Sequence, residues 1–223
     1  MYSPPPDPDT ELRVRARHAR AAEALDVRVE SGGEFWGWAG STLGAPARTT
    51  TGEAVWLRLA STPEDKAVGR RSGCADPFGA LDGRRPALLG VHDAFDDGTA
   101  YQAELSVRVD EPVLSGDPAL QHGLRLPDSW WNDLAGTLAK VTAVDKDCVA
   151  VRQQYMEWAI PEFVGIPAPV VSHWTAAHAD VRWANLTDPL RLLDWEAWGR
   201  APEGFDAAML YAYSLHQPDM PPV

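Results

Sequence analysis

The chain has 223 residues, 45% of them hydrophobic, which is enough to bury a real core and argues against disorder as the main state. Its 20 lysines and arginines against 32 aspartates and glutamates give a net charge of -12, which repels phosphodiester backbones and anionic lipid surfaces. We therefore expect neither nucleic acid nor membrane as a partner. The charge favours a cationic small molecule, and it is compatible with a nucleotide whose phosphates are offset by a metal ion and local donors. Acidity that serves only solubility is an equally good reading.

The two cysteines, Cys74 and Cys148, lie far apart and have neither the spacing of a zinc site nor that of a disulfide framework. We expect two free thiols in a reducing cytoplasm. The N-terminus lacks the basic start and apolar core of a signal peptide, and no run approaches about 18 apolar residues. The sequence therefore predicts a cytoplasmic protein without a membrane span.

The N-terminal region begins with proline-rich residues 1–9, which we expect to form a loose tail. A helix is predicted over Glu11–Leu25, with Asp9 or Thr10 as its cap. The apolar spacing predicts one buried face, made of Leu12, Ala16, Ala19, Ala22 and Leu25. Val27 and Val29 follow as a short strand.

Residues 32–44, which precede a turn at residues 49–52, predict a hairpin, because aromatic residues suited to a strand run into three spaced glycines. Glycines allow a backbone to approach phosphate closely, so Gly37, Gly40 and Gly44, with Ser41 among them, are candidates for a loop that covers phosphates. The pattern is not a Walker loop, since no Gly-Lys-Ser/Thr follows. Taken alone, it is more typical of a plain hairpin bent by glycines.

The remaining N-terminal half predicts an antiparallel sheet. Ala54–Ala60 is a strand with one cation, Arg58, which either reaches water or faces a phosphate. Only a short helix, Glu64–Arg70, is predicted before the next strands. Leu88–Ala94 and Tyr101–Val109 then bracket a turn, and the second run alternates apolar and polar residues as a half-buried strand does.

The sequence changes character after residues 111–112, where a passage rich in proline and glycine predicts a boundary between lobes. We place residues 1–113 in a β-rich lobe and residues 114–223 in a mainly helical lobe. One helix is predicted from Asp128 or Ser129, with a face of Trp131, Leu134, Leu138 and Val141. A second is predicted over about Cys148–Phe163, stopped by the prolines that begin at Pro161.

The polar residues between positions 178 and 206 are set among apolar neighbours, which is typical of functional groups. Phosphoryl transfer needs a carboxylate that deprotonates a hydroxyl and oxygen ligands for Mg²⁺. Asp180 and Asn185 are five residues apart, so both can project from one tight loop. A turn at Asp188-Pro189 would fold the chain back and bring Asp194 beside them. We expect His178 to hold this loop by backbone hydrogen bonds rather than to do chemistry.

Over this stretch the chain resembles the aminoglycoside phosphotransferase family, which has a protein-kinase-like fold. The resemblance rests on His178-Ala-Asp180-Val-Arg-Trp-Ala-Asn185-Leu, on Leu-Leu-Asp194-Trp-Glu and on Phe205-Asp206. It is specific over the C-terminal quarter and diffuse upstream. The resemblance implies an α+β, two-lobed fold with an N-terminal antiparallel sheet lobe and a mainly helical C-terminal lobe. It further implies that ATP and Mg²⁺ bind between the lobes and that a hydroxyl of a small molecule, such as an amino sugar or another cationic acceptor, is phosphorylated.

Carried over by position, the resemblance implies that Asp180 is the catalytic base, that Asn185 and Asp194 ligate Mg²⁺, and that Asp206 steadies the catalytic loop. Arg58 stands where the family has a strand lysine, and no helix glutamate that would pair with this cation is evident. The chain also ends sooner after Asp194 than the family usually does, so the acceptor pocket is incomplete, completed by a partner or truncated.

Two alternatives to an active phosphotransferase follow from these departures. One is a catalytically weak, pseudokinase-like module that binds nucleotide or serves as a scaffold. The other is a non-enzymatic partner-binding protein. The sequence specifies neither the acceptor nor the oligomeric state.

Overall fold

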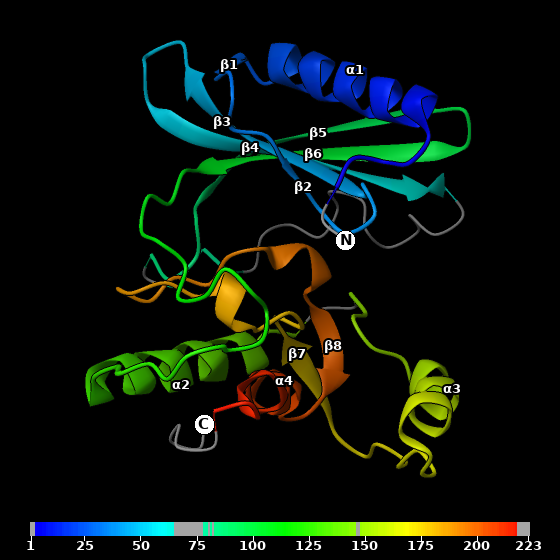
Figure 1. Cartoon of the computed structure of the whole chain (residues 1–223), viewed down its shortest axis with the longest axis vertical. Helices are drawn as coiled ribbons and strands as arrows, with labels where there is room; N and C mark the ends of the chain where they lie inside the picture. The colour runs from blue at the N-terminus through cyan, green and yellow to red at the C-terminus, as the bar shows by residue number, and fades with distance from the viewer. Residues whose placement is uncertain (1–2, 65–77, 80, 82, 146–147, 218–223) are drawn as a thin grey trace. The chain divides into compact units, whose positions relative to one another are not determined.

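The structure, a computed structural model, describes residues 3–64, 78, 79, 81, 83–145 and 148–217 (Figure 1). The chain forms two compact units, one made of Met1–Asp76 with Pro86–Val109 and the other of Pro77–Arg85 with Asp110–Val223. A single division at residues 113 and 114 would place Pro77–Arg85 in the first unit, whereas the structure groups this segment with the second. The first unit is built on an antiparallel sheet and the second mainly on helices, which confirms the predicted α+β class.

The sheet of the first unit contains β1 (Val27–Val29), β2 (Phe35–Trp36), β3 (Thr42–Thr49), β4 (Ala54–Pro63), β5 (Leu88–Asp96) and β6 (Thr99–Val107). Its strand order is β1-β3-β4-β6-β5, and β2 pairs with β3 beside β1. Every pairing is antiparallel. The predicted hairpin and the three longer predicted strands are therefore confirmed.

Helix α1 (Pro8–Ala24) begins earlier than predicted, because Asp7 is its cap. The Asp7 carboxylate accepts the backbone N–H of Thr10 at 3.0 Å, which satisfies one of the unpaired donors of the first turn. Pro5 is buried as well. The expectation of a loose tail over residues 1–9 is therefore wrong for the residues from Pro5 onward.

The buried face of α1 also differs from the predicted one. Leu12 is 65% exposed, and the buried side chains are Val14, His18, Ala21 and Ala22. Helix α1 lies along one face of the sheet (Figure 1), where its small residues pack against Val55, Leu57, Leu59, Tyr101, Ala103 and Leu105. His18 contributes a polar contact, since its Nε2 lies 3.3 Å from the carbonyl oxygen of Leu57. Burial lowers the pKa of His18.

The second unit contains α2 (Asp128–Thr142), α3 (Gln153–Val164), β7 (Trp174–Ala177), β8 (Gly199–Pro202), α4 (Phe205–Ser214) and the short 3-10 turns η2 (Trp183–Asn185) and η3 (Trp195–Ala197). The predicted helix at Asp128 is confirmed, although its cap is Pro127, without a side-chain hydrogen bond. The core of the unit is made of Phe78, Leu81, Leu120, Trp130, Leu134, Val141, Val181, Trp183, Leu186, Leu190, Leu192, Trp195 and Leu210.

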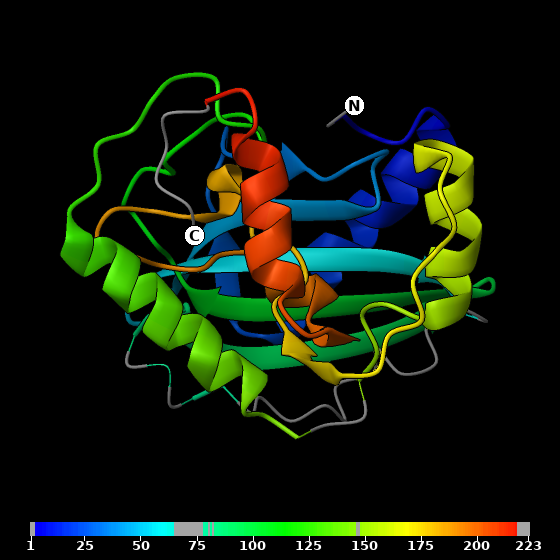
Figure 2. The ribbon, with the colours of Figure 1, turned by 90° about the horizontal axis from the view of Figure 1, so that it is seen from below.

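The loop before α2 meets the end of α4, where the N–H of Leu120 donates to the carbonyl of Tyr213 at 2.9 Å (Figure 2). Trp183 Nε1 donates to Ser214 Oγ of the same helix at 3.0 Å. Helix α4 therefore anchors both the loop before α2 and the turn η2.

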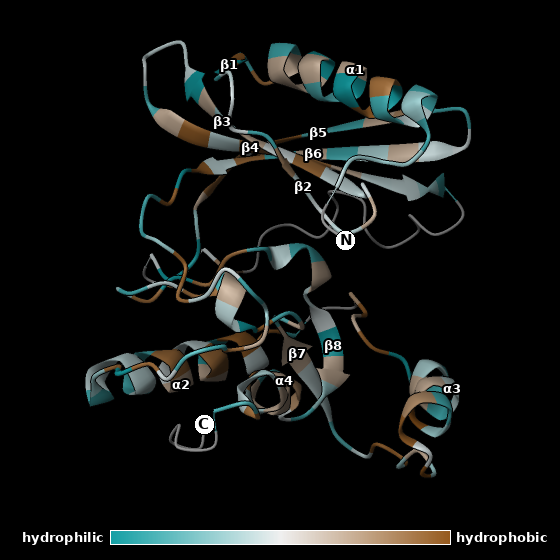
Figure 3. Ribbon diagram, in the orientation of Figure 1, coloured by the Kyte–Doolittle hydropathy of each residue, from teal (hydrophilic) through white to brown (hydrophobic). Residues whose placement is uncertain are grey.

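Helix α3 departs from the prediction at its start and at its proline. Residues 148–151 lie outside the helix, and Arg200 of β8 offers them backbone partners: its N–H donates to the Cys148 carbonyl at 2.7 Å and its carbonyl accepts the Ala150 N–H at 3.1 Å. Pro161 lies inside α3, which ends at Gly165 in the left-handed conformation. Figure 3 shows apolar residues along both α2 and α3, but only those of α2 are buried.

The described residues bear on three further expectations: the state of the cysteines, the helix Glu64–Arg70 and the membrane span. Cys148 is disulfide-bonded, so the free thiol expected there is wrong, and Cys74 lies outside the described residues. Most of the predicted helix Glu64–Arg70 lies outside them as well. Within the described ranges, no helix is long and apolar enough to cross a membrane.

Candidate active site

The carboxylate of Asp206, near the start of α4, holds the loop that follows β7. The backbone N–H groups of His178 and Ala179 donate to its two oxygens, each at 2.8 Å. Ala179 has a φ of 64°, a left-handed conformation that costs a residue with a β-carbon free energy. Asp206 is buried, and burial raises its pKa while the two hydrogen bonds lower it. The loop therefore holds an unfavourable backbone conformation because Asp206 binds it.

His178 connects this loop to the segment that precedes Asp194. Its Nδ1 accepts the N–H of Asp180 at 3.2 Å, so Nε2 carries the hydrogen and donates to the carbonyl of Leu193 at 3.0 Å. The ring also packs edge-on against Trp195, with 4.5 Å between centroids. Burial lowers the pKa of His178 to about 4, against the opposing effect of the Asp194 carboxylate. At neutral pH the imidazole is therefore uncharged, and it links the loop to the segment before Asp194 by hydrogen bonds.

Asp180 and Asn185 meet across the same loop. The Nδ2 of Asn185, at the end of η2, donates to the backbone carbonyl of Asp180 at 3.0 Å and to its Oδ2 at 2.8 Å. Because both partners are acceptors, the amide nitrogen must face them, which leaves Oδ1 of Asn185 as the atom that can ligate a cation. The five-residue spacing thus brings both predicted side chains together.

Asp194 joins the pair through an arginine. Nη2 of Arg182 lies 3.0 Å from Asp180 Oδ2 and 3.9 Å from Asp194 Oδ2. The backbone of Asp194 is left-handed, with φ 60° and ψ 68°, where it caps η3. The three side chains are each between 19% and 28% exposed, so a small ligand can reach a cluster that is otherwise shielded.

The predicted turn at Asp188-Pro189 brings the chain back, as the antiparallel bridge between Leu186 and Leu192 shows. The N–H of Leu193 then donates to the carbonyl of Asn185 at 2.9 Å. This bond places Asp194 next to the residues that flank Asn185.

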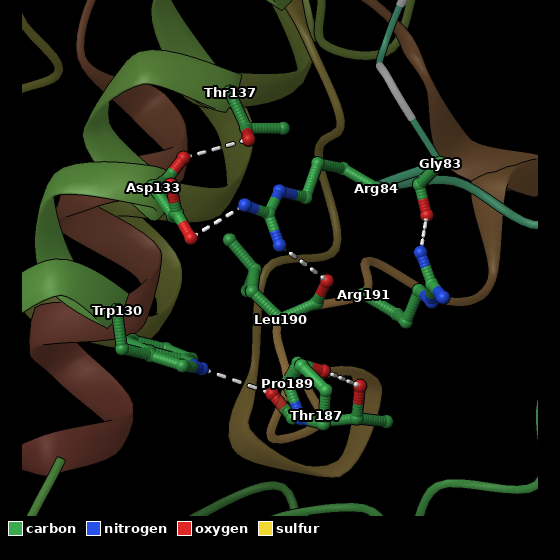
Figure 4. A network of polar contacts seen from close by, with 9 residues as sticks. All are labelled: Gly83, Arg84, Trp130, Asp133, Thr137, Thr187, Pro189, Leu190 and Arg191. Carbon is green, nitrogen blue, oxygen red and sulfur yellow. Dashed lines mark hydrogen bonds and ion pairs between the residues drawn. The ribbon is translucent and has the colours of Figure 1, made fainter. Parts of the chain in front are cut away.

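Gly83 and Arg84 contact residues 190–192, the segment that returns after the turn (Figure 4). Arg84 pairs with Asp133 of α2 at 2.5 Å, and its Nη1 donates to the Leu190 carbonyl at 3.4 Å. The carbonyl of Arg84 accepts the N–H of Leu192 at 2.7 Å, and Arg191 donates to the Gly83 carbonyl. Gly83 and Arg84 therefore tie α2 to the segment that leads into Asp194.

The predicted phosphate loop in the first unit is a tight turn between β2 and β3. Within it, the N–H of Gly37 donates to the Thr42 carbonyl at 2.9 Å, that of Gly40 to the Gly37 carbonyl at 3.2 Å, and that of Ser41 to the Trp38 carbonyl at 3.1 Å. These three donors thus close the turn in this structure.

Close packing accounts for two of these glycines, so no ligand is needed to explain them. Gly40 has a φ of +72°, and a β-carbon there would lie 2.4 Å from the nitrogen of Pro5. A β-carbon on Gly44, in β3, would lie 2.7 Å from the ring of Trp56. These constraints favour the plain hairpin, and the phosphate-binding role of the loop stays a prediction.

Arg58 lies on β4 directly opposite Glu104 of β6, and the two side chains form an ion pair at 3.9 Å. The alternation of β4 buries Leu57 and Leu59 under α1 and turns Arg58 to the other face. One acid that pairs with this cation, Glu104, therefore lies on a strand, whereas the resemblance implies a partner on a helix. The alternating pattern of residues 101–109 placed Glu104 among the polar positions, which was the available signal.

Arg182 is the functional candidate that the sequence did not single out. Only its place in the five-residue loop between Asp180 and Asn185 could have signalled that it reaches the acids. In the described part of the chain, no three His, Cys, Asp or Glu residues form a group that could hold a metal ion alone. Asn185 and Asp194 nevertheless suit Mg²⁺, which is often bound by one or two carboxylates together with water and phosphate oxygens.

No protein-family model and no curated protein match the sequence. The structure has a two-lobed, protein-kinase-like α+β fold. It is similar to an amicoumacin kinase, hAmiN, solved in complex with AMP-PNP, Ca²⁺ and Ami, with a TM-score of 0.59, 11% identity and coverage of 96% of this chain and 73% of that one.

Two further solved structures support the same fold. An aminoglycoside-3'-phosphotransferase of type VIII matches with a TM-score of 0.54 and 17% identity, over 91% of this chain and 85% of that one. The macrolide 2'-phosphotransferase MphH from Brachybacterium faecium matches with a TM-score of 0.52 and 15% identity, over 86% of this chain and 78% of that one. The predicted fold class is thus confirmed, and the resemblance to aminoglycoside phosphotransferases is confirmed at the level of the fold.

Proposed function

We propose that the protein transfers a phosphoryl group from ATP, with Mg²⁺, to a hydroxyl group of a small molecule. The observation that carries the proposal is the hydrogen-bonded unit of Asp180 and Asn185, joined to Asp194 through Arg182, within a protein-kinase-like fold. Phosphoryl transfer depends on positioning and electrostatics, and this unit supplies a carboxylate, an amide oxygen and a second carboxylate from one hydrogen-bonded loop and the segment that follows it.

Asp180 is the residue that would accept the proton of the acceptor hydroxyl. Asn185 orients its carboxylate through the 2.8 Å hydrogen bond, and the side chain is about one-fifth exposed. His178 and Asp206 fix the backbone on which it stands. A base held in this way is already oriented when the acceptor binds.

Asn185 Oδ1 and the Asp194 carboxylate are the oxygen atoms that would hold Mg²⁺. When bound, the ion would neutralise charge on the phosphates. One similar structure was solved with an ATP analogue and Ca²⁺, which supports the use of a nucleotide and a divalent ion. Arg58 would add a cation for the phosphates, and the turn that contains Gly37, Gly40, Ser41 and Gly44 would lie along them.

The acceptor is proposed to be a small molecule, and a cationic one, such as an amino sugar, suits the net charge of -12. The names of the similar structures, which include aminoglycoside and macrolide phosphotransferases, agree with an acceptor of this size.

The test is to measure binding of ATP by calorimetry with and without Mg²⁺, and transfer to a panel of amino sugars and amino alcohols. Asp194→Asn should abolish the Mg²⁺ dependence of binding, because it removes the carboxylate assigned to the metal. Asp180→Asn should keep Mg-ATP binding and lose turnover. The exposed Asp188, in the turn of the same hairpin, provides the matched control Asp188→Asn, which should behave as the wild type. Unchanged Mg²⁺ dependence of ATP binding in Asp194→Asn would contradict the assignment of Asp194 as a metal ligand.

A second candidate, a nucleotide-binding module with weak transfer, is favoured by the ion pair between Arg182 and Asp180. A guanidinium bound to the expected base competes with the acceptor proton for its oxygen. Binding of Mg-ATP without any phosphorylated product across the panel would support this candidate over the active enzyme.

A further inference from the structure

We propose that Arg182 is an internal counter-ion: it holds Asp180 and Asp194 together in the metal-free protein, and a divalent cation has to displace it from Asp194. The proposal rests on the proposed function for the identity of the metal ligands. It goes further in assigning a role to Arg182, which the sequence alone did not suggest.

The geometry of the guanidinium supports this role. A single atom, Arg182 Nη2, lies 3.0 Å from Asp180 Oδ2 and 3.9 Å from Asp194 Oδ2. The arginine side chain is 19% exposed and the two acids 20% and 28%, so solvent screens their charges only in part. Two carboxylates that share one shielded site repel each other, and a cation between them removes that repulsion.

The backbone makes Arg182 suited to this position. Arg182 is extended, with φ -140° and ψ 162°, immediately before the η2 turn. Its side chain therefore projects from the loop at a position between Asp180, the proposed base, and Asn185. Asn185 already donates to Asp180 Oδ2, so this oxygen accepts from two donors, one of them charged.

A divalent cation and Arg182 cannot both be satisfied at Asp194. Mg²⁺ binds carboxylate oxygens at about 2.0–2.1 Å, so an ion on Asp194 would stand close to a guanidinium of like charge. Arg182 must then turn away, and nucleotide phosphates are a new partner that its planar fork can bind. A metal ion alone should consequently bind weakly, and nucleotide and metal should strengthen each other.

The experiment measures binding of Mn²⁺ alone, without nucleotide, by calorimetry. Arg182→Gln should bind Mn²⁺ about tenfold more tightly than the wild type, because the competing cation is gone. Arg182→Lys keeps the charge and should remain weak. The matched control is Arg200→Gln, an exposed arginine on β8 of the same unit, which changes the net charge equally and should leave the affinity unchanged.

Equal or weaker Mn²⁺ binding by Arg182→Gln, or no binding by it at all, would overturn the proposal. Circular dichroism checks the fold, and Arg182→Met, which keeps the apolar stem, gives an independent reading if the glutamine variant is unstable. Because ATP and acceptor are absent, a protein that fails to transfer phosphate can still show the gain in Mn²⁺ affinity. Failure of the proposed function is thereby distinguished from failure of this inference.

Discussion

The carboxylate of Asp206 accepts the backbone N–H of Ala179 at 2.8 Å, and Ala179 has a φ of 64°. The second oxygen of Asp206 accepts the N–H of His178 at the same distance. The first turn of α4 therefore fixes the backbone immediately before Asp180. The orientation of the expected base thus depends on a residue that lies 26 positions further along the chain.

We expect Asp206→Ala to lower the free energy of unfolding by roughly 2–4 kcal/mol, since two buried N–H groups lose their acceptor. Chemical denaturation measures the change. Glu203→Ala is the matched control, because Glu203 is an exposed acid three residues earlier. That substitution should change stability by less than about 0.5 kcal/mol. Equal effects of the two substitutions would contradict the anchoring role of Asp206.

Ala179→Gly should raise stability by about 1 kcal/mol, because glycine adopts a positive φ without the steric cost that alanine has there. The matched substitution in regular helix is Ala208→Gly in α4, where the same change should cost about 1 kcal/mol. Thermal and chemical denaturation of the two variants give the comparison. A loss of stability in Ala179→Gly would show that its conformation is not strained.

His178 should make folding stability depend on pH below neutrality. Its pKa is about 4 in the folded protein and near 6.5 in the unfolded chain. The unfolded chain therefore binds more protons between these values, and stability falls as the pH falls from about 6.5 to about 4, by on the order of 3 kcal/mol.

The contribution of His178 is isolated by comparing unfolding of the wild type and His178→Gln across pH 4 to 7. The variant should lose most of the dependence of unfolding free energy on pH that His178 provides. Any slope from the buried His18, whose pKa is also lowered, should remain in both proteins. The exposed His216 supplies the control His216→Gln. A slope that survives unchanged in His178→Gln would mean that another group is responsible.

The parts of the fold that the sequence predicted well depend on local spacing. The five-residue loop from Asp180 to Asn185 and the turn at residues 188–189 bring their residues together through contacts close in the chain. The strict alternation of β6 likewise follows from the period of a strand. Such patterns need no knowledge of distant partners.

The predictions that failed depend on partners far along the chain. The spacing of apolar residues alone predicts the wrong face of α1, because His18 is buried where the carbonyl of Leu57 is within its reach. Residues 148–151 lie outside the predicted helix because Arg200 of β8 pairs with them. Glu104 could be matched to Arg58 only once β4 and β6 were known to be neighbours. Tertiary contacts therefore decided the points that propensity left open.

The ion pair of Arg58 and Glu104 leads to a prediction about nucleotide binding. Arg58→Gln should weaken binding of Mg-ATP about tenfold if this cation serves the phosphates, since a charge-assisted contact is lost. Glu104→Gln should have a smaller effect, because it removes only a partner at 3.9 Å. Calorimetric titration with Mg-ATP measures both.

Arg48→Gln is the matched control for this prediction, because Arg48 is a strand arginine of the same sheet that pairs with an acid, Glu30, at 2.8 Å. It should leave Mg-ATP affinity unchanged. In a double-mutant cycle of stability, Arg58 and Glu104 should show a coupling of only about 0.5–1 kcal/mol, since the pair is long and partly exposed. Unaltered Mg-ATP affinity in Arg58→Gln would remove this residue from the nucleotide site and leave it a purely structural role in the sheet.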